Sequence, residues 1–252
     1  MTLPLILFHN QGRGRPVGGG ISYTNKVLGI DLANLIGYWP MNEAAGTDAL
    51  DASPESNDGT YNSDVSGWPP GTGIGDGNTA PTFDGTNDYN DLETAAFFAD
   101  FDGDLGTVAM WLKAYSVGIW TDSTWRYLFR HRENNNNYVV IARTDADNRI
   151  ELFRYGNNVG KIVRADGVTT TDWFHLAMTW DDTTDELKAY LDGSQIGTTQ
   201  TPLAAWTGTS LFDSIIGAST TASGDVWHGW LAHVALWTKA LTPAQIASLA
   251  TV

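Results

Sequence analysis

From Leu35 to the C-terminus, short runs of alternating apolar and polar residues are separated by clusters of glycine, asparagine and aspartate. In one run, Phe174, Leu176 and Met178 share a face, as they would on a β-strand with one buried side. Turn dipeptides such as Asp192-Gly193 join successive runs, and this dipeptide between alternating segments is a hairpin signal. Roughly ten or more such strands predict an all-β fold of two packed antiparallel sheets.

A helix start signal stands near the C-terminus. Thr242 can cap a helix, Pro243 suits its first turn, and Gln245 can complete a capping box. Ile246 and Leu249 then give one apolar stripe. We therefore expect a short C-terminal helix that lies against the sandwich.

Residues 1–34 lack the strand pattern and predict an extended, glycine-rich arm, whereas residues 35–252 predict one sandwich domain. Residues 21–35 are ambiguous, because they could start with a short helix that Gly29 weakens. No Lys or Arg precedes the apolar strip at residues 3–8 and no cleavage site follows it closely, so we expect no signal peptide there. Residues 1–37 carry a charge of +2, from Arg13, Arg15 and Lys26 against Asp31, while the whole chain carries −15. A basic arm on an acidic body predicts docking to neighbouring subunits. The residues expected to dock are Leu5, Phe8, Arg13, Arg15 and Tyr23.

Composition excludes several classes of protein. The net charge of −15 repels phosphates, which argues against nucleic-acid binding. No stretch of about 18 apolar residues occurs, so we expect no insertion into a membrane. The chain has no cysteine, which removes disulfides, thiolate nucleophiles and cysteine-based zinc sites.

Six segments carry a resemblance to a known family. They are Gly37–Glu43 (GYWPMNE), Phe83–Tyr89 (FDGTNDY), Trp173–Trp180 (WFHLAMTW), Tyr190–Gly193 (YLDG), Gly229–Trp237 (GWLAHVALW) and Ala240–Ile246 (ALTPAQI). In this order and spacing they resemble the concanavalin A-like, laminin-G- and pentraxin-like jelly rolls. The resemblance implies a two-sheet jelly-roll sandwich that binds a sugar, a protein or calcium.

The sequence argues against an enzyme. Some relatives of this fold are glycoside hydrolases that resemble one another in an E-x-D-x-x-E strand, and none of the six glutamates here begins E-x-D. There is no G-x-S-x-G elbow and no H-E-x-x-H spacing. His175 lies opposite the apolar face of its strand, and we interpret it as a packed, hydrogen-bonded histidine.

Aromatic residues in expected loops are candidates for ligand binding, because such rings stack on sugars and anchor interfaces. The alternative is that most of them cap the ends of the core, with one or two exposed. The candidates are Trp68, Trp120, Trp125, Trp206 and Trp227.

Calcium is the metal that the sequence could hold, because it binds carboxylate, amide and carbonyl oxygens. Asp84, Asp88 and Asp91 cluster around one expected turn. The competing interpretation, which we favour, is that these side chains only close turns.

Two functions remain. The first is a non-enzymatic structural or decoration protein of a virus particle, and a bacteriophage is the virus that we expect. In this function the sandwich is displayed on the virion surface and the arm docks to neighbouring subunits. The second is a lectin-like carbohydrate-binding module, with or without calcium, that is extracellular or on a cell surface.

Overall fold

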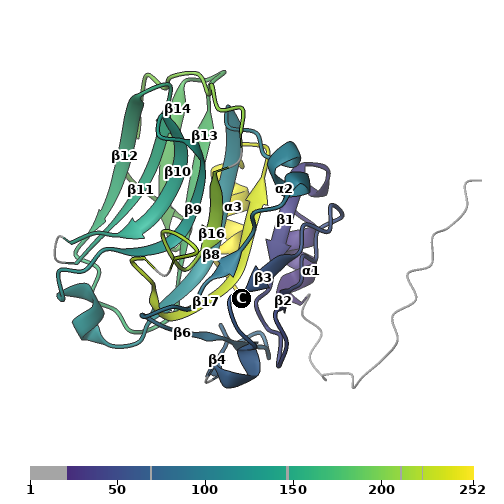
Figure 1. Ribbon diagram of the computed structural model, residues 1–252. Coiled ribbons are helices and arrows are strands. Elements are labelled where there is room, and N and C mark those ends of the chain that lie inside the picture. The colour runs from purple at the N-terminus through teal and green to yellow at the C-terminus, as the bar shows by residue number, and fades with distance from the viewer. Residues whose placement is uncertain (1–21, 69, 146–147, 211, 223) are drawn as a thin grey trace, which may run out of the picture.

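The computed structural model describes residues 22–68, 70–145, 148–210, 212–222 and 224–252. Within these residues the chain forms two antiparallel sheets that face each other across an apolar core (Figure 1). The seven-stranded sheet contains, in spatial order, β1 (Leu35–Trp39), β17 (His228–Trp237), β8 (Leu105–Ala114), β13 (Phe174–Asp181), β14 (Glu186–Leu191) and β15 (Ser194–Gln200), and β6 (Thr82–Asp84) also pairs with β17. The predicted two-sheet antiparallel jelly roll is confirmed.

The eight-stranded sheet forms the other layer. Its spatial order is β12 (Val159–Asp166), β11 (Arg149–Gly156), β10 (Asn137–Arg143), β9 (Arg126–Asn134), β16 (Asp213–Ile216), β7 (Asn90–Asp91), β3 (Gly59–Tyr61) and β2 (Asp48–Ala49). A separate ribbon pairs β4 (Gly71–Thr72) with β5 (Thr79–Ala80). Strands β9 to β12 follow one another as antiparallel neighbours, so this half of the sheet is built from local hairpins.

Tryptophan rings fill much of the space between the sheets. Trp39, Trp120, Trp180 and Trp227 are all fully buried there. Trp180 on β13 lies opposite Gly106 on β8, and a Cβ atom at position 106 would come 2.1 Å from the indole. Glycine is required at this position because the ring of Trp180 occupies the space of its side chain.

Short helices pack around the sandwich. They are α1 (Tyr23–Leu28), α2 (Ala95–Asp100) and α3 (Pro243–Leu249), with 3-10 turns η1 (Leu32–Asn34), η2 (Val65–Gly67) and η3 (Val117–Trp120). Helix α3 confirms the expected C-terminal helix, including its capping box between Thr242 and Gln245. In the part of the chain that the structure describes, no helix is long and apolar enough to cross a membrane.

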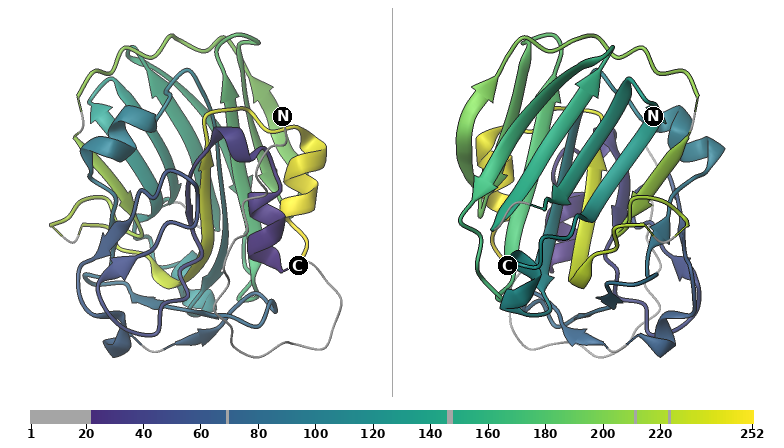
Figure 2. Two further views of the ribbon diagram at one scale, coloured as in Figure 1. Left: turned by 90° about the vertical axis from the view of Figure 1, so that its right-hand side faces the viewer. Right: turned by 60° about the vertical axis from the view of Figure 1, so that its left-hand side comes forward.

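The structure corrects the predicted boundary of the N-terminal arm. Residues 22–34 are not extended, because the Ser22 side chain caps α1 and the apolar face of that helix packs on the sandwich. Tyr23, expected to dock on another subunit, is buried and donates a hydrogen bond to the Leu249 carbonyl oxygen at 2.6 Å. Helices α1 and α3 therefore lie side by side on the outer face of the seven-stranded sheet (Figure 2, left). The other arm residues, Leu5, Phe8, Arg13 and Arg15, lie outside the described residues.

A buried polar network holds the loop between β4 and β5 to this same face. His233, at a bulge in β17, lies 3.1 Å from the Asp76 carboxylate through Nε2, and its Nδ1 lies 2.8 Å from the Tyr38 hydroxyl. Burial alone would raise the pKa of Asp76, but the hydrogen bond from His233, the charge of a protonated His233 and hydrogen bonds from Asn78 lower it to about 2. The folded state therefore favours the ionised carboxylate.

We expect Asp76→Asn to lower the free energy of unfolding by roughly 2 kcal/mol at pH 7, because the folded-state pKa is depressed from its ordinary value. A depressed pKa stabilises the protein above about pH 4, and the contribution is lost as the pH falls toward about 2. Urea unfolding of wild type and D76N from pH 7 to pH 2 should therefore show two curves that converge. The exposed Asp172→Asn variant is the control, and a constant gap between wild type and D76N would contradict the assignment.

Candidate binding face on the eight-stranded sheet

Side chains of β9 to β12 alternate between the core and the outer face, and the outer set is aromatic and basic. Buried Leu128, Val139 and Leu152 point into the core. On the outer face, the pairing places Arg132 beside Tyr138 and Tyr138 beside Tyr155. A second row joins Arg130, Val140, Phe153 and Ile162, and a third joins Tyr127, Ala142, Glu151 and Arg164. These strands face the viewer in Figure 2, right.

Two adjoining hollows cross these rows and form what we call the groove. The first, of about 230 Å³, is lined by Tyr127, Arg130, Arg132, Asn135, Tyr138 and Val140. The second, of about 270 Å³, is lined by Trp125, Tyr127, Tyr138, Val140, Ala142, Glu151, Phe153 and Ile162. The hollows share Tyr127, Tyr138 and Val140, so they are continuous. Each is smaller than the roughly 300–1,000 Å³ of an enclosing small-molecule pocket, which suits a ligand that lies across the sheet.

Aromatic rings line the groove and hold one another in place. Tyr138 stacks on Tyr155 with ring centroids 4.9 Å apart, and it contacts Phe153 at 5.3 Å. Trp125 is 37% exposed and lies 6.3 Å from Tyr127. Burial raises the pKa of both Tyr127 and Tyr138 above the ordinary value of 10.0, so their hydroxyl groups stay protonated at neutral pH. The groove therefore offers flat apolar surfaces bordered by hydroxyl groups, which is the chemistry that binds a sugar ring.

Two arginines at one end of the groove share one buried carboxylate. Arg132 donates to Asp213 Oδ2 through Nε (2.8 Å) and Nη2 (2.5 Å), and Arg130 Nε lies 3.0 Å from Asp213 Oδ1. Phe212 stacks on the Arg132 guanidinium at 3.7 Å. The Asp213 side chain is 5% exposed, whereas the two arginine side chains are 14% and 16% exposed. Asp213 thus fixes the orientation of two cations at the surface of the hollow.

Three of the five candidate tryptophans belong to the core and cannot meet a ligand. Trp68 is buried between Tyr61 and Phe83, and it donates a hydrogen bond to Ser63 Oγ at 2.9 Å. Trp120 and Trp227 are fully buried and pack on each other at 5.9 Å. Their burial corrects the ligand-binding prediction for these residues and fits the alternative that most of the candidates cap the core. Trp125 alone among the five lines the groove.

Trp206 lies away from the groove, in an acidic hollow beside α2. This hollow is lined by Asp100, Asp102, Asp104 and Glu133 among others. Arg154 binds Asp182 at 2.9 Å, and Asp182 shares a hydrogen bond with Asp104. Burial and then the interaction with Asp104 raise the pKa of Asp182 to about 7, although Arg154 opposes the shift. Because Arg154 is nearly fully buried and binds the Asp182 carboxylate, we interpret this network as structural.

The three aspartates considered for calcium close turns instead of converging. Asp84 Oδ1 accepts hydrogen bonds from the Thr86 and Asn87 amides, and Asp91 Oδ1 accepts one from the Glu93 amide. Asp88 is buried and its Oδ2 accepts from the Asp84 amide at 2.9 Å; burial raises its pKa to about 6. Across the described residues, no three His, Cys, Asp or Glu side chains form a group that could hold a metal ion. Calcium binding stays a prediction.

His175 is packed as expected but is not fully hydrogen-bonded. It is 1% exposed and lies edge-on to Trp111 at 5.4 Å. Among the described residues, its Nδ1 has no hydrogen-bond partner, which corrects that part of the interpretation. Burial lowers the pKa of His175 to about 3, so the ring is neutral at physiological pH.

Most residues of the groove were not predicted from the sequence, because the predicted ligand-binding residues lie in loops. Tyr127, Arg130, Arg132, Tyr138 and Phe153 lie on strands, in segments that were read only as strands. The available signal was the alternation in residues 130–134, where arginines at 130 and 132 must share a face. An irregularity of pairing between Ile141 and Ala142 interrupts the register, so the position of Tyr127 relative to this row could not be counted from the sequence.

The fold and this open groove define a class of lectin-like jelly-roll proteins. Residues 84–247 match the laminin-G-type family model described as the concanavalin A-like lectin/glucanases superfamily. The chain belongs to this superfamily. No curated protein matches the sequence.

Solved structures of similar fold come from several bacterial proteins. Domain 4 of AbnA, a GH43 extracellular arabinanase from Geobacillus stearothermophilus solved with arabinotriose, has a TM-score of 0.66 and 17% identity over 86% of this chain and 98% of that one. The CBM40 of a Ruminococcus gnavus IT-sialidase, bound to α2,3-sialyllactose, has a TM-score of 0.55 and 11% identity over 68% of this chain and 96% of the CBM40. The receptor-binding domain of a botulinum neurotoxin of mosaic serotype C/D has a TM-score of 0.64 and 13% identity. The match covers 87% of this chain and 51% of the neurotoxin domain, so this chain spans about half the length of that domain. At these identities the likeness concerns the fold.

We expect Asp213→Asn to lower the free energy of unfolding by about 3 kcal/mol, because it leaves two partly buried guanidinium groups without their shared carboxylate. The matched control is Asp166→Asn, whose ion pair with Arg149 at 2.6 Å lies at the surface, where solvent screens it, and should have a clearly smaller effect on unfolding. Chemical unfolding of both variants measures the difference. Equal effects would mean that Asp213 does not hold the two arginines together.

Proposed function

We propose that this chain is a non-enzymatic carbohydrate-binding module that holds an oligosaccharide in the groove. The observation that carries the proposal is the continuous line of exposed and half-exposed aromatic rings on the outer face of β9 to β11, from Trp125 past Tyr127 and Tyr138. Planar rings offer apolar surface at little entropic cost, and the surrounding hydroxyl, amide and guanidinium groups can bind sugar hydroxyls. Two of the structures of similar fold hold an oligosaccharide, which supports the proposal at the level of the fold.

The acid groups of the groove do not favour hydrolysis. Glycoside hydrolysis needs two carboxyl groups on opposite sides of the bond that breaks. Among the described residues that line the groove, Glu151 is the only carboxylic acid, and Arg164 binds it at 2.9 Å. A carboxylate held by arginine is disfavoured as a general acid, because the positive charge stabilises its ionised form. The groove therefore suits binding without bond cleavage.

Two locations for the module follow from the sequence: the cell surface or exterior, and the surface of a virus particle. Lectin-like domains of this kind suit an extracellular or surface-displayed location, which is the one we favour. Display on a virus particle through an N-terminal arm stays a prediction, because residues 1–21 lie outside the described residues.

Affinity electrophoresis against a panel of neutral and acidic polysaccharides tests the proposal, with titration calorimetry on the best oligosaccharide. We expect Tyr138→Ala and Trp125→Ala each to weaken binding by about tenfold or more, since a buried aromatic contact contributes about 1.4 kcal/mol or more. The matched control is Tyr115→Ala, an aromatic residue that is 56% exposed but lies outside the groove. If no polysaccharide binds, or if Y115A has the same effect as Y138A, the proposal fails.

Incubation of the protein with the polysaccharide that it binds should release no new reducing ends over a day. We also expect Glu151→Gln to retain binding within a few-fold, because this side chain is held by Arg164 and serves the architecture of the groove. Steady release of reducing ends that E151Q abolishes would assign the chain to the hydrolases instead.

A further inference from the structure

Charge is strongly segregated along this chain. Residues 43–104 contain fourteen acidic residues and no lysine or arginine, which gives −14 for that segment. Residues 126–166 contain eight basic residues against five acidic ones, which gives +3. All seven arginines of the described residues fall in the second segment, on β9 to β12.

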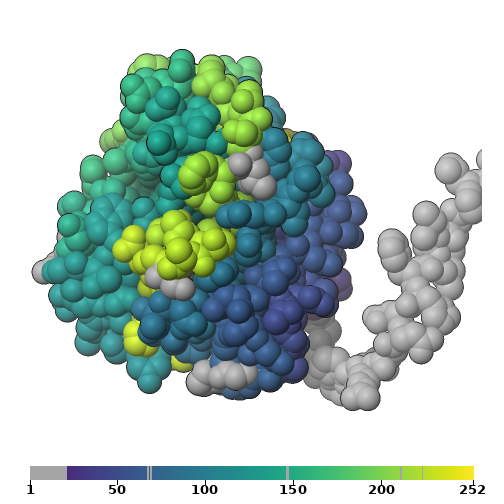
Figure 3. All heavy atoms as spheres, viewed as in Figure 1, coloured from purple at the N-terminus to yellow at the C-terminus, as the bar shows by residue number. Residues whose placement is uncertain are grey.

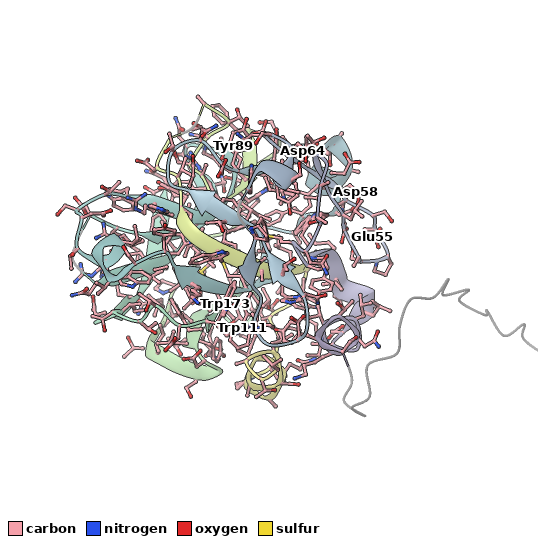
Figure 4. The ribbon with its side chains drawn as sticks, turned by 90° about the horizontal axis from the view of Figure 1, so that it is seen from below. Glu55, Asp58, Asp64, Tyr89, Trp111 and Trp173 are labelled. Carbon is pink, nitrogen blue, oxygen red and sulfur yellow. The ribbon has the colours of Figure 1, made fainter. Side chains whose placement is uncertain are left out.

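The two segments meet at a few contacts, such as that of Arg154 with Asp104, but most of each lies on a different part of the surface. Residues 43–104, in blue, cover the right and lower parts of the surface in Figure 3, whereas β9 to β12, in teal, form its left part. Seen from below in Figure 4, Glu55, Asp58 and Asp64 lie together along one side of the molecule. An acidic protein with a basic patch on one sheet attracts anions to that patch, because local fields at short range outweigh the net charge.

Two arginines that line the groove keep N–H donors without partners among the described residues. Arg130 donates through Nη1 to the Ser219 carbonyl oxygen at 2.7 Å, and its Nε faces the Asp213 carboxylate. A guanidinium group carries five N–H donors, so these contacts leave its Nη2 group for a ligand. Arg132 uses Nε, Nη2 and one hydrogen of Nη1, the last toward Asn135 Oδ1 at 3.2 Å. Both side chains line the hollow that contains Tyr127 and Tyr138.

The balance of charge at this end of the groove favours an anion. Two guanidinium groups face one carboxylate, Asp213, so these three side chains together carry one net positive charge. Two further acidic residues lie close by: Asp91 is the last residue of β7, and Glu93 follows that strand. Glu93 interacts electrostatically with Asp91, Asp213 and Arg132. Burial, followed by repulsion from Asp91 and Asp213, raises the pKa of Glu93 to about 7, so Glu93 is partly protonated at neutral pH.

We propose that the groove binds an acidic glycan, with the carboxylate or sulfate group of one sugar on Arg130 and Arg132 and the adjacent ring on Tyr138. This inference rests on the proposed function and specifies its ligand class. The fixed guanidinium planes suit such a group, since arginine binds planar oxyanions through paired N–H donors. Phe212 and Asp213 hold the Arg132 plane in position before any ligand arrives.

Titration calorimetry with three probes tests this inference. The probes are an oligogalacturonate, its fully methyl-esterified form and a sulfated heparin oligosaccharide. We expect at least one acidic probe to bind tenfold or more tightly than the neutral ester, and we expect its affinity to fall with added salt. Tight binding of the galacturonate shows that a carboxylate is sufficient, whereas tight binding of heparin alone, which carries both carboxylate and sulfate groups, shows that the sulfate is required.

Variants then locate the contact. Arg132→Gln should lower the affinity for the acidic probe at least tenfold, whereas Arg149→Gln, at a surface ion pair on the same sheet, should leave it within twofold. Arg132→Lys keeps the charge but loses the paired donors, so it should give an intermediate loss and remains informative if R132Q fails to fold. Circular dichroism checks the fold of each variant.

The outcomes separate this inference from the proposed function. Equal binding of the neutral ester and both acidic probes, or unchanged binding in folded R132Q and R132K, overturns the acidic-ligand inference and leaves a module for neutral sugars. Failure to bind any sugar in the panel overturns both.

Discussion

The packing of the two sheets against each other determines everything else in this molecule. Because their inner faces bury large rings such as Trp39 and Trp180, the side chains of β9 and β11 alternate between this core and the outer face of their sheet. Fully buried tryptophans contribute much of the hydrophobic free energy of such a core, and their size leaves no side-chain space at Gly106. The groove follows from this alternation, since each residue that points inward on β9 to β11 obliges its neighbour to point outward.

Much of the fold could be predicted from the sequence because this alternation is local. The strands around Phe174–Asp181 and the capped helix at Thr242 were expected where they lie. The helix at Tyr23 stayed ambiguous in the sequence because Gly29 weakens its signal, and because its stability comes from packing on α3. Tertiary contact between residues more than 200 positions apart cannot be counted from a linear pattern.

The candidate site was harder to predict than the fold, for a physical reason. Loop tryptophans such as Trp120 and Trp227 were candidates because rings near turns are often exposed, but the ends of this sandwich needed them as core. The residues that do line the groove sit on strands, and their grouping depends on which strands are neighbours. Strand β16, which brings Asp213 to Arg132, arrives from residues about eighty positions later in the chain.

The contact between α1 and α3 determines from which face a fused polypeptide would leave the molecule. Tyr23 and Leu249 are joined by a hydrogen bond, and Lys26 binds Thr251, so both ends of the described body meet on the outer face of the seven-stranded sheet. The groove lies on the opposite outer face. A polypeptide fused ahead of residue 22 or after Val252 would leave from the back, with the groove pointing away from it. The same proximity makes the chain suited to circular permutation, with a short linker between the old ends and new ends opened in a surface hairpin.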